Sequence, residues 1–365
     1  QRWKKNMSYE FSITKNPNPK PKPDPDTLVF GQVFTDHMFV MDYDEGKGWH
    51  DGRILPYGDI LISPASSVLH YAQMMFEGMK AYRTEDGHVQ LFRPEMNARR
   101  LNRTNERMCM PQMDEDLFVA AVKAVVKMDA DWVPDAPFTS LYVRPFIIAD
   151  DPALGVKSAK HFRFMIILCP SGPYYAANRG KLSTTRIFVE DEFIRAAHGG
   201  TGYAKVGGNY AGSLRASQKA HECDCNDVLW LDAIEHKYVE EVGSSNAFFM
   251  IGDEIITAPL AGTILPGITR DSVLTLLREW GIRASERKIS IDDIIAAAKK
   301  GELKEAFASG TAAVISPMGL LHYQDKEYTI SNREVGPISQ KLYDTITGIQ
   351  TGKIADTHGW IQRVV

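Results

Sequence analysis

The sequence contains few cysteines, no long apolar run and no marked excess of one charge. Of its 365 residues, four are cysteines, and only Cys223 and Cys225 lie close together. Their spacing fits neither a zinc site nor a thioredoxin-like motif, so we expect a reduced intracellular protein without a bound metal. No apolar stretch approaches the length of a membrane span, which argues against a membrane protein. A formal net charge of −4 disfavours nucleic-acid binding.

The composition is that of an ordinary globular protein. Hydrophobic residues make up 44% of the chain and charged residues 24%, which is typical of globular domains. The first residues are polar, and no apolar segment of a secretory signal follows them. We therefore expect a cytoplasmic protein, or one of the mitochondrial matrix if a transit peptide has been removed.

Proline and glycine divide the chain. Its length favours two domains. Residues 1–26 end in alternating prolines, which predict an extended arm that is either disordered or laid across a surface. Glycine, proline and polar residues indicate a linker at 171–182. We therefore expect a small α/β domain at 27–170 and a large domain at 183–365.

The hydrophobic periodicity predicts alternating helices and strands. Ser66 can cap a helix that runs from Val68 to Lys80, with Gly78 as a stop signal. Further helices are expected at 93–108, 115–128, 211–220, 269–280, 291–300 and 337–350. Strands are expected at 141–148, 164–169, 185–189, 227–232, 239–242, 247–251 and 305–308.

The most distinctive stretch is Gly199–Tyr210, in which five glycines surround Lys205. Glycine lets the backbone approach a ligand closely, and a lysine held there can form a Schiff base with a carbonyl group. A mobile surface loop with a solvated lysine would give the same pattern. The P-loop order, with Gly-Lys followed by Ser or Thr, is absent, so a nucleoside triphosphate site is disfavoured.

Three other groups of charged residues attract attention. Residues 93–107 carry five arginines, of which one could turn inward to a phosphate. Arg144 lies in a predicted strand and needs an anionic partner if it is buried, either a carboxylate of the protein or a substrate. Glu240 and Glu241 are adjacent strand residues, so we expect them to point to opposite faces.

Several motifs in matching order resemble pyridoxal-phosphate enzymes of fold type IV, and most closely the branched-chain amino acid aminotransferases. They are Arg93–Leu101, the Lys205 loop, Tyr238–Asn246, Leu265–Arg270 and Ala308–Ala312. The resemblance runs from about Val29 to near the C-terminus. It implies an α/β (α+β) two-domain fold with pyridoxal 5'-phosphate between the domains, and a homodimer. It also implies ping-pong transfer of the amino group between leucine, isoleucine or valine and 2-oxoglutarate.

The resemblance also assigns roles to individual residues. Lys205 is the catalytic residue that holds the cofactor as an aldimine. The other expected cofactor-binding residues are Arg100, Ile268, Thr269 and Thr311 for the phosphate, Tyr210 and Glu241 for the ring, and Arg195. The expected substrate-binding residues are Phe30, Tyr71, Phe76, Tyr142, Arg144, Tyr174, Thr311 and Ala312.

Some alternatives stay open at this point. D-amino acid aminotransferase and aminodeoxychorismate lyase share the implied fold. A dinucleotide-binding oxidoreductase is less favoured, because Lys205 stands where that fingerprint needs its third glycine. Mammalian members of the resembling family carry a redox Cys-x-x-Cys that is replaced here by Ala313 and Ser316, so we expect no thiol switch there.

Overall fold

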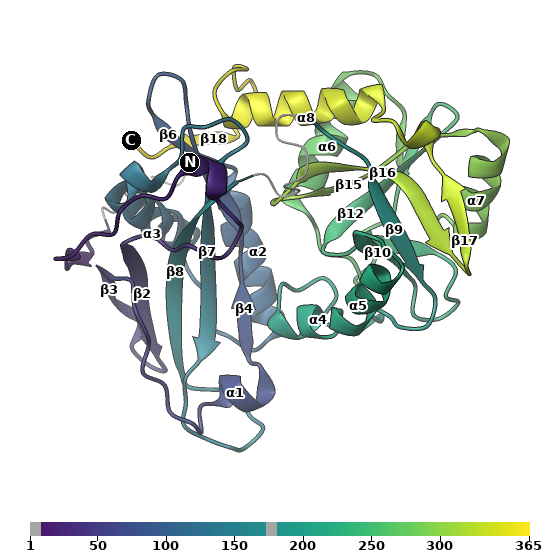
Figure 1. Cartoon of the computed structure of the whole chain (residues 1–365). Coiled ribbons are helices and arrows are strands. Elements are labelled where there is room, and N and C mark those ends of the chain that lie inside the picture. Colours follow the sequence, from purple (N-terminus) through teal and green to yellow (C-terminus); the bar gives the residue numbers. More distant parts are fainter. Residues whose placement is uncertain (1–8, 173–180) are drawn as a thin grey trace, which may run out of the picture. The chain divides into compact units, whose positions relative to one another are not determined.

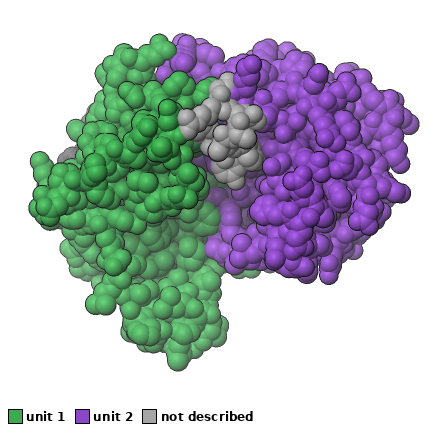
Figure 2. Space-filling view, in the orientation of Figure 1, with its two compact units in different colours: residues 1–172, 358–365 green, residues 173–357 purple. Residues whose placement is uncertain are grey.

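The computed structural model describes residues 9–172 and 181–365, which form two compact units. Unit 1 comprises residues 1–172 and 358–365, and unit 2 comprises residues 173–357 (Figure 2). Most of the expected linker at 171–182, with Tyr174, lies outside the described residues. The structure differs from the expected division at the C-terminus, because residues 358–365 belong to unit 1.

Unit 1 is built on a nine-stranded sheet in the order β1-β3-β2-β8-β7-β5-β6-β18, with β4 paired to β7 (Figure 1). Its strands are β1 (Ser12–Ile13), β2 (His37–Asp44), β3 (Gly48–Pro56), β4 (Met74–Phe76), β5 (Met79–Arg83), β6 (Val89–Phe92), β7 (Ser140–Ala149), β8 (His161–Ser171) and β18 (Ile361–Arg363). Its helices are α1 (Ser67–Tyr71), α2 (Pro94–Arg107) and α3 (Glu115–Met128), with 3-10 turns at Pro25–Thr27 and Ala130–Trp132.

The main core of unit 1 lies between the sheet and the helices α2 and α3. Phe118 and Val122 of α3 join Leu101 of α2, Leu141 of β7 and Phe164 of β8 in one buried cluster. Apolar residues at helical spacing predicted α3, and Asp114 caps it by accepting a hydrogen bond from the Leu117 N–H at 3.0 Å. Alternate strand residues face the other side of the sheet, where a second apolar cluster lies.

The expected helix at 68–80 is wrong beyond its first turn. Helix α1 ends at Tyr71, and Ala72 adopts a left-handed conformation with φ of 50°. Met74 to Phe76 then pair with β7 as strand β4. The hydrogen bonds offered by β7 outweigh the helical pattern of the apolar residues, because tertiary pairing overrides a weak local preference.

The proline-rich arm lies against the surface of unit 1. Ser12 and Ile13 pair in parallel with β3. The Asn16 N–H donates to His37 Nε2 at 2.9 Å, and the Lys20 N–H donates to Asp36 Oδ1 at 2.9 Å. For the residues from 9 onward, the structure supports the arm laid across a surface and not the disordered arm. Its prolines have no N–H to donate, and the N–H groups of Asn16 and Lys20 donate to side chains of unit 1.

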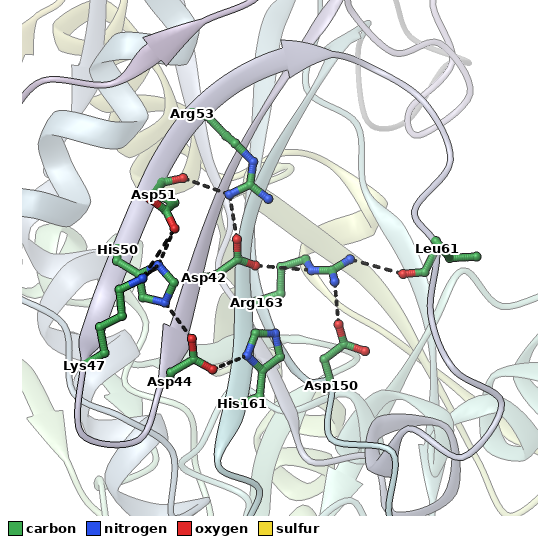
Figure 3. Close-up of polar contacts among 10 residues, drawn as sticks. All are labelled: Asp42, Asp44, Lys47, His50, Asp51, Arg53, Leu61, Asp150, His161 and Arg163. Atoms are coloured by element: carbon green, nitrogen blue, oxygen red, sulfur yellow. Dashed lines mark hydrogen bonds and ion pairs between the residues drawn. The ribbon is translucent and has the colours of Figure 1, made fainter.

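A network of charged side chains joins β2, β3 and β8 (Figure 3). Asp42 of β2 lies 3.6 Å from the Arg163 guanidinium of β8. Asp44 lies 2.9 Å from His161 and 2.9 Å from His50, and these hydrogen bonds hold the pKa of the Asp44 carboxyl below its ordinary value. The network therefore links the three neighbouring strands through their charged side chains as well as through their backbones.

Unit 2 contains a second nine-stranded sheet in the order β11-β10-β9-β16-β15-β12-β13-β14, with β17 paired to β16. Strand β11 also pairs with β12, so six of the strands form a closed circuit. The strands are β9 (Thr185–Glu190), β10 (Asp227–Leu231), β11 (Val239–Val242), β12 (Ser245–Ile251), β13 (Glu254–Thr257), β14 (Ala284–Glu286), β15 (Leu303–Gly310), β16 (Val314–Tyr323) and β17 (Lys326–Thr329). The helices are α4 (Gly207–Ala211), α5 (Leu214–Glu222), α6 (Ile268–Glu279), α7 (Ile291–Lys300) and α8 (Pro337–Gln350), with a 3-10 turn at Ser331–Arg333.

Helices α5 and α7 pack against strands of the unit 2 sheet. Ile294 of α7 packs with Phe249 of β12 and Leu321 of β16 in a buried cluster, and Trp230 of β10 packs under α5. The expected helices at 291–300 and 337–350 agree with α7 and α8. Within the residues that the model describes, no helix is both long and apolar enough to cross a membrane.

Candidate functional site

In unit 2, the loop that carries Lys205 is tied to the short helix that follows it. Lys205 Nζ donates a hydrogen bond to the Tyr210 hydroxyl at 2.9 Å. The side chain of Asn209 closes the loop, because its amide donates to the backbone oxygens of Thr201 and Ala204, each at 2.8 Å. The lysine is therefore held in place next to a phenol, and the alternative of a solvated lysine on a mobile loop does not describe this structure.

Glu241 lies in the interior of unit 2 with an incomplete set of partners. Its Oε1 accepts from the Leu265 N–H at 2.9 Å and from the Asn246 amide at 3.1 Å. Its Oε2 lies 2.8 Å from Arg195 Nε but accepts no hydrogen bond. Burial raises the pKa of Glu241 to about 7, although Arg195 and the Leu265 N–H favour the charged form. A carboxyl with this pKa can share a proton with a basic ring nitrogen near neutral pH.

The N-terminus of α6 provides a place for a phosphate. Gly267 precedes the helix and no side chain caps it, so the first N–H groups of Ile268 and Thr269 point to the helix end. A Cβ at Gly267 would lie 2.1 Å from Asn246 Oδ1, so only glycine allows this approach of the helix to β12. Asn246 thus positions both this helix end and Glu241.

Thr311 and Ala312 lie in the turn that connects β15 to β16. Both are partly buried, and the neighbouring Ser309 hydroxyl is buried without a hydrogen-bond partner. This turn can therefore offer N–H and O–H groups to a ligand.

These observations fit pyridoxal 5'-phosphate. The cofactor needs an amine for its aldehyde, an acid for its pyridine nitrogen and donors for its phosphate. Unit 2 supplies Lys205, the buried carboxyl of Glu241 and the helix end at Ile268 and Thr269. Their assignment to the cofactor remains a prediction.

In unit 1, Arg100 is an inward-facing arginine of α2, and it pairs with a carboxylate. Arg100 Nε donates to Glu77 Oε1 and Nη2 donates to Glu77 Oε2, both at 2.8 Å. Glu77 also accepts from the Asn97 amide at 2.7 Å and from the Gly78 N–H at 3.3 Å. The predicted phosphate contact of Arg100 would therefore involve a guanidinium that Glu77 already orients.

The expected substrate-binding residues of unit 1 form an aromatic cluster around Arg144. The Arg144 guanidinium lies 4.7 Å from the centre of the Phe76 ring, and its Nη2 donates to the Tyr142 hydroxyl at 3.0 Å. The Phe30 ring packs edge-on against Tyr142, with 4.8 Å between ring centres. Tyr71, the last residue of α1, makes a different contact, because its hydroxyl donates to the Leu154 carbonyl.

Sequence reasoning missed three residues that organise these groups. Glu77, Asn246 and Thr263 are buried or partly buried polar residues, and each one binds the side chain of a predicted site residue: Arg100, Glu241 and Arg195 respectively. The Asn246 position follows Glu241 by five residues and pairs with it across β11 and β12. A polar residue opposite a buried carboxylate in a tight hairpin is the signal that could have revealed it.

Solved structures of known proteins agree with this fold. A branched-chain aminotransferase from Thermoproteus uzoniensis, solved with norvaline, has a TM-score of 0.73 and 26% identity, over 90% of this chain and 100% of that one. A branched-chain amino acid aminotransferase with pyridoxamine 5'-phosphate, from the organism abbreviated T.th., has a TM-score of 0.72 and 25% identity, over 89% and 98%. The likeness therefore extends over nearly all of both units.

Relatives in sequence are closer still. Residues 74–319 match the family model "Amino-transferase class IV". Two relatives come from Bacillus subtilis: "Branched-chain-amino-acid aminotransferase 2" is 55% identical over 99% of this chain and 98% of its own length, and "Branched-chain-amino-acid transaminase 1" is 53% identical over 93% and 94%. With a family match over more than half of its residues and relatives above 50% identity over nearly its whole length, the chain belongs to the class IV aminotransferases.

Proposed function

We propose that this chain is a pyridoxal-phosphate-dependent branched-chain amino acid aminotransferase that exchanges amino groups between leucine, isoleucine or valine and 2-oxoglutarate. The observation that carries the proposal is the Lys205–Tyr210 hydrogen bond in the same unit as Glu241, whose Oε2 accepts no hydrogen bond. The family match and the names of the two Bacillus subtilis relatives support this reaction and this class of substrate.

The bound cofactor supplies an electron sink that stabilises negative charge at the substrate Cα. With the cofactor bound, Lys205 Nζ would take the proton from the substrate Cα as general base and then donate that proton as general acid. The Tyr210 hydroxyl, 2.9 Å from Nζ, orients the amine. The Glu241 carboxyl would pair with the protonated ring nitrogen, and its pKa of about 7 suits the sharing of a proton there near neutral pH.

Arg144 supports the choice of 2-oxoglutarate as the second substrate. Its Nε is buried without a hydrogen-bond partner, and within the described residues it pairs with no carboxylate. A partly buried guanidinium without a protein carboxylate can bind an anionic ligand, and 2-oxoglutarate carries a side-chain carboxylate that leucine lacks. The rings of Phe76, Tyr142 and Phe30 offer apolar surface to branched side chains in the same cluster.

Absorption spectroscopy tests the reaction class. We expect purified protein to show the visible band of bound pyridoxal phosphate, and leucine to convert it to the band of the aminated cofactor. Lys205→Ala should lose turnover by about 10²- to 10⁴-fold, because it removes the group that moves the proton. A band that responds to D-alanine and not to leucine would favour a D-amino acid aminotransferase. A protein that never binds pyridoxal phosphate would contradict the proposal.

A specificity measurement tests Arg144. We expect Arg144→Met to lower kcat/KM for 2-oxoglutarate by about 10²-fold, since a charged hydrogen bond is lost. The value for 2-oxo-4-methylpentanoate, which has no second carboxylate, should change less than about threefold. Equal losses of kcat/KM for both substrates would show that Arg144 shapes the cluster but does not bind the side-chain carboxylate.

The proposal includes a homodimer in the cytoplasm. Closed two-fold dimers are the commonest oligomers, and Cys109, Cys169, Cys223 and Cys225 are all free, which suits a reducing compartment. Light scattering that found only monomer at micromolar concentration would contradict the dimer, and cell fractionation tests the compartment.

A further inference from the structure

The neighbouring carboxylates of β11 are both buried. Glu240 and Glu241 are 8% and 1% exposed. Both side chains reach the segment 259–267: Glu241 Oε1 accepts from the Leu265 N–H at 2.9 Å, and Glu240 Oε1 accepts from the Thr263 hydroxyl at 2.6 Å. The two carboxylates therefore hold the same segment from two sides, although only Glu241 has an expected role toward the cofactor.

Thr263 connects Glu240 to Arg195. While its hydroxyl donates to Glu240, its backbone oxygen accepts from Arg195 Nη1 at 2.9 Å. The same guanidinium donates through Nη2 to the Gly202 oxygen at 3.2 Å and places Nε 2.8 Å from Glu241 Oε2. One arginine thus joins the segment 259–267, the loop that carries Lys205 and Glu241.

The contact between that segment and the lysine loop is close. A Cβ at Gly202 would lie 2.3 Å from the Thr263 oxygen, so the two backbones meet where only glycine fits. A shift of Thr263 would consequently move Gly202, which precedes Lys205 by three residues.

We propose that Glu240 is a positioning residue: by fixing Thr263, its carboxylate holds Arg195 against Glu241 and sets how the cofactor ring and Lys205 are presented. The inference rests on the proposed function, since it assigns the ring nitrogen to Glu241. Glu240 acts on the lysine loop through Thr263 and Arg195.

The charges around the pair support this role. Burial raises the pKa of Glu240, while Thr263 and Arg195 favour its charged form; Asp232 and Lys288 are the other charged groups that act on it. The pKa of Glu241 is raised by burial and further by Glu240, and lowered by Arg195 and Lys205. Arg195 is therefore shared between two carboxylates, and the charge of Glu240 makes Glu241 easier to protonate.

The test compares Glu240→Gln, Thr263→Val and the control Glu254→Gln. Glu254 is a partly buried carboxylate of β13 that pairs with Arg287 at 2.9 Å. For each variant, we would measure the dissociation constant of pyridoxal phosphate from the apo-protein as a function of pH, and then kcat and KM for leucine.

Glu240→Gln keeps an acceptor for Thr263 but removes the charge, so the acid limb of cofactor binding should move to lower pH by about half a unit. Thr263→Val keeps the charge but releases Arg195, so the limb should move to higher pH, and kcat should fall about tenfold with KM unchanged. Glu254→Gln should match the wild type.

Identical pH profiles for the wild type, Glu240→Gln and Thr263→Val would overturn the inference. A lower unfolding temperature with an unchanged profile and unchanged kcat would also overturn it, because Glu240 would then serve stability alone. If the wild-type apo-protein bound no pyridoxal phosphate at any pH, the proposed function itself would fail, which this experiment distinguishes.

Discussion

Each unit contains a buried arginine–glutamate pair, and the two pairs differ in how many partners the carboxylate has. In unit 1, both oxygens of Glu77 accept from Arg100 at 2.8 Å, and Asn97 and Gly78 donate to the same carboxylate. In unit 2, Glu241 satisfies one oxygen, and the other accepts no hydrogen bond even though Arg195 Nε lies 2.8 Å away.

The two carboxylates therefore differ in their own partners: Glu77 accepts hydrogen bonds on both oxygens, and Glu241 accepts them on one. A buried carboxylate whose oxygens all accept hydrogen bonds stabilises the fold and has no capacity left for chemistry. A buried carboxylate oxygen that is paired with a charge but accepts no hydrogen bond can still take a hydrogen bond from a ligand.

The largest expected effect comes from breaking the closed pair. Glu77→Ala leaves the buried Arg100 without its carboxylate and should lower the free energy of unfolding by about 3–5 kcal/mol. Glu241→Gln should lower it by no more than about 1 kcal/mol, because the replaced carboxyl is already half protonated near its pKa of about 7 and Gln still accepts from Leu265. Urea unfolding of the apo-protein measures both. If both variants lost the same unfolding free energy, the two pairs would contribute equally to stability, which contradicts this comparison.

A smaller effect should follow from replacing the arginine of the Arg195–Glu241 pair with lysine. Arg195→Lys keeps the positive charge, but one ammonium group cannot reach Thr263, Gly202 and Glu241 together as the guanidinium does. We expect the affinity for pyridoxal phosphate to fall by about tenfold to a hundredfold in a fluorescence titration. Arg186→Lys, on a partly exposed arginine that pairs with Glu327, is the control and should leave the affinity unchanged.

The smallest expected effect concerns Asp227, a carboxyl at the start of β10 that is held by a backbone donor. Its Oδ1 accepts from the Val228 N–H at 2.9 Å, and burial raises its pKa to about 6 from an ordinary 3.8. Because the folded state binds the proton more tightly, the stability falls as pH rises from about 4 through 6. Asp227→Asn removes this loss and should raise the free energy of unfolding at pH 8 by about 1–2 kcal/mol, with no gain at pH 4.

Asp232 gives the matched control with the opposite sign. Burial alone would raise its pKa, but four backbone N–H donors, from Ile234 to Tyr238, lower the pKa to about 2. Its stabilising contribution is therefore present above about pH 4 and is lost as pH falls through 2. Asp232→Asn should destabilise the protein at pH 8. A stability gain in both variants would contradict the assignment of these shifts.

The sequence was most informative where a local signal and the packing agreed. Helices α3, α7 and α8 run between the residues that their apolar spacing and end signals predicted. The lysine loop was recognisable because five glycines surround one lysine within a dozen residues. The family resemblance, which depends on such local motifs, is confirmed by the class IV match.

Sequence patterns could not predict contacts between residues far apart in the chain. Met74 to Phe76 form a strand only because β7 lies beside them, and nothing local distinguishes them from a helix. The contacts of Glu240 are of the same kind: strand alternation gives the direction of its Cβ, but Thr263, 23 residues later, determines where the carboxylate ends. The surroundings of Arg144 likewise depend on which side chains the fold brings near.

The pairing of β18 with β6 has a consequence for synthesis. Residues 358–365 follow all of unit 2 in the chain, yet Ile361 to Arg363 complete the edge of the unit 1 sheet. During translation, the edge of β6 therefore stays unpaired until the whole of unit 2 has been synthesised. An unpaired strand edge can pair with the wrong strand. A nascent chain arrested before residue 358 has every helix that the structure describes but lacks the strand that pairs with β6 in unit 1.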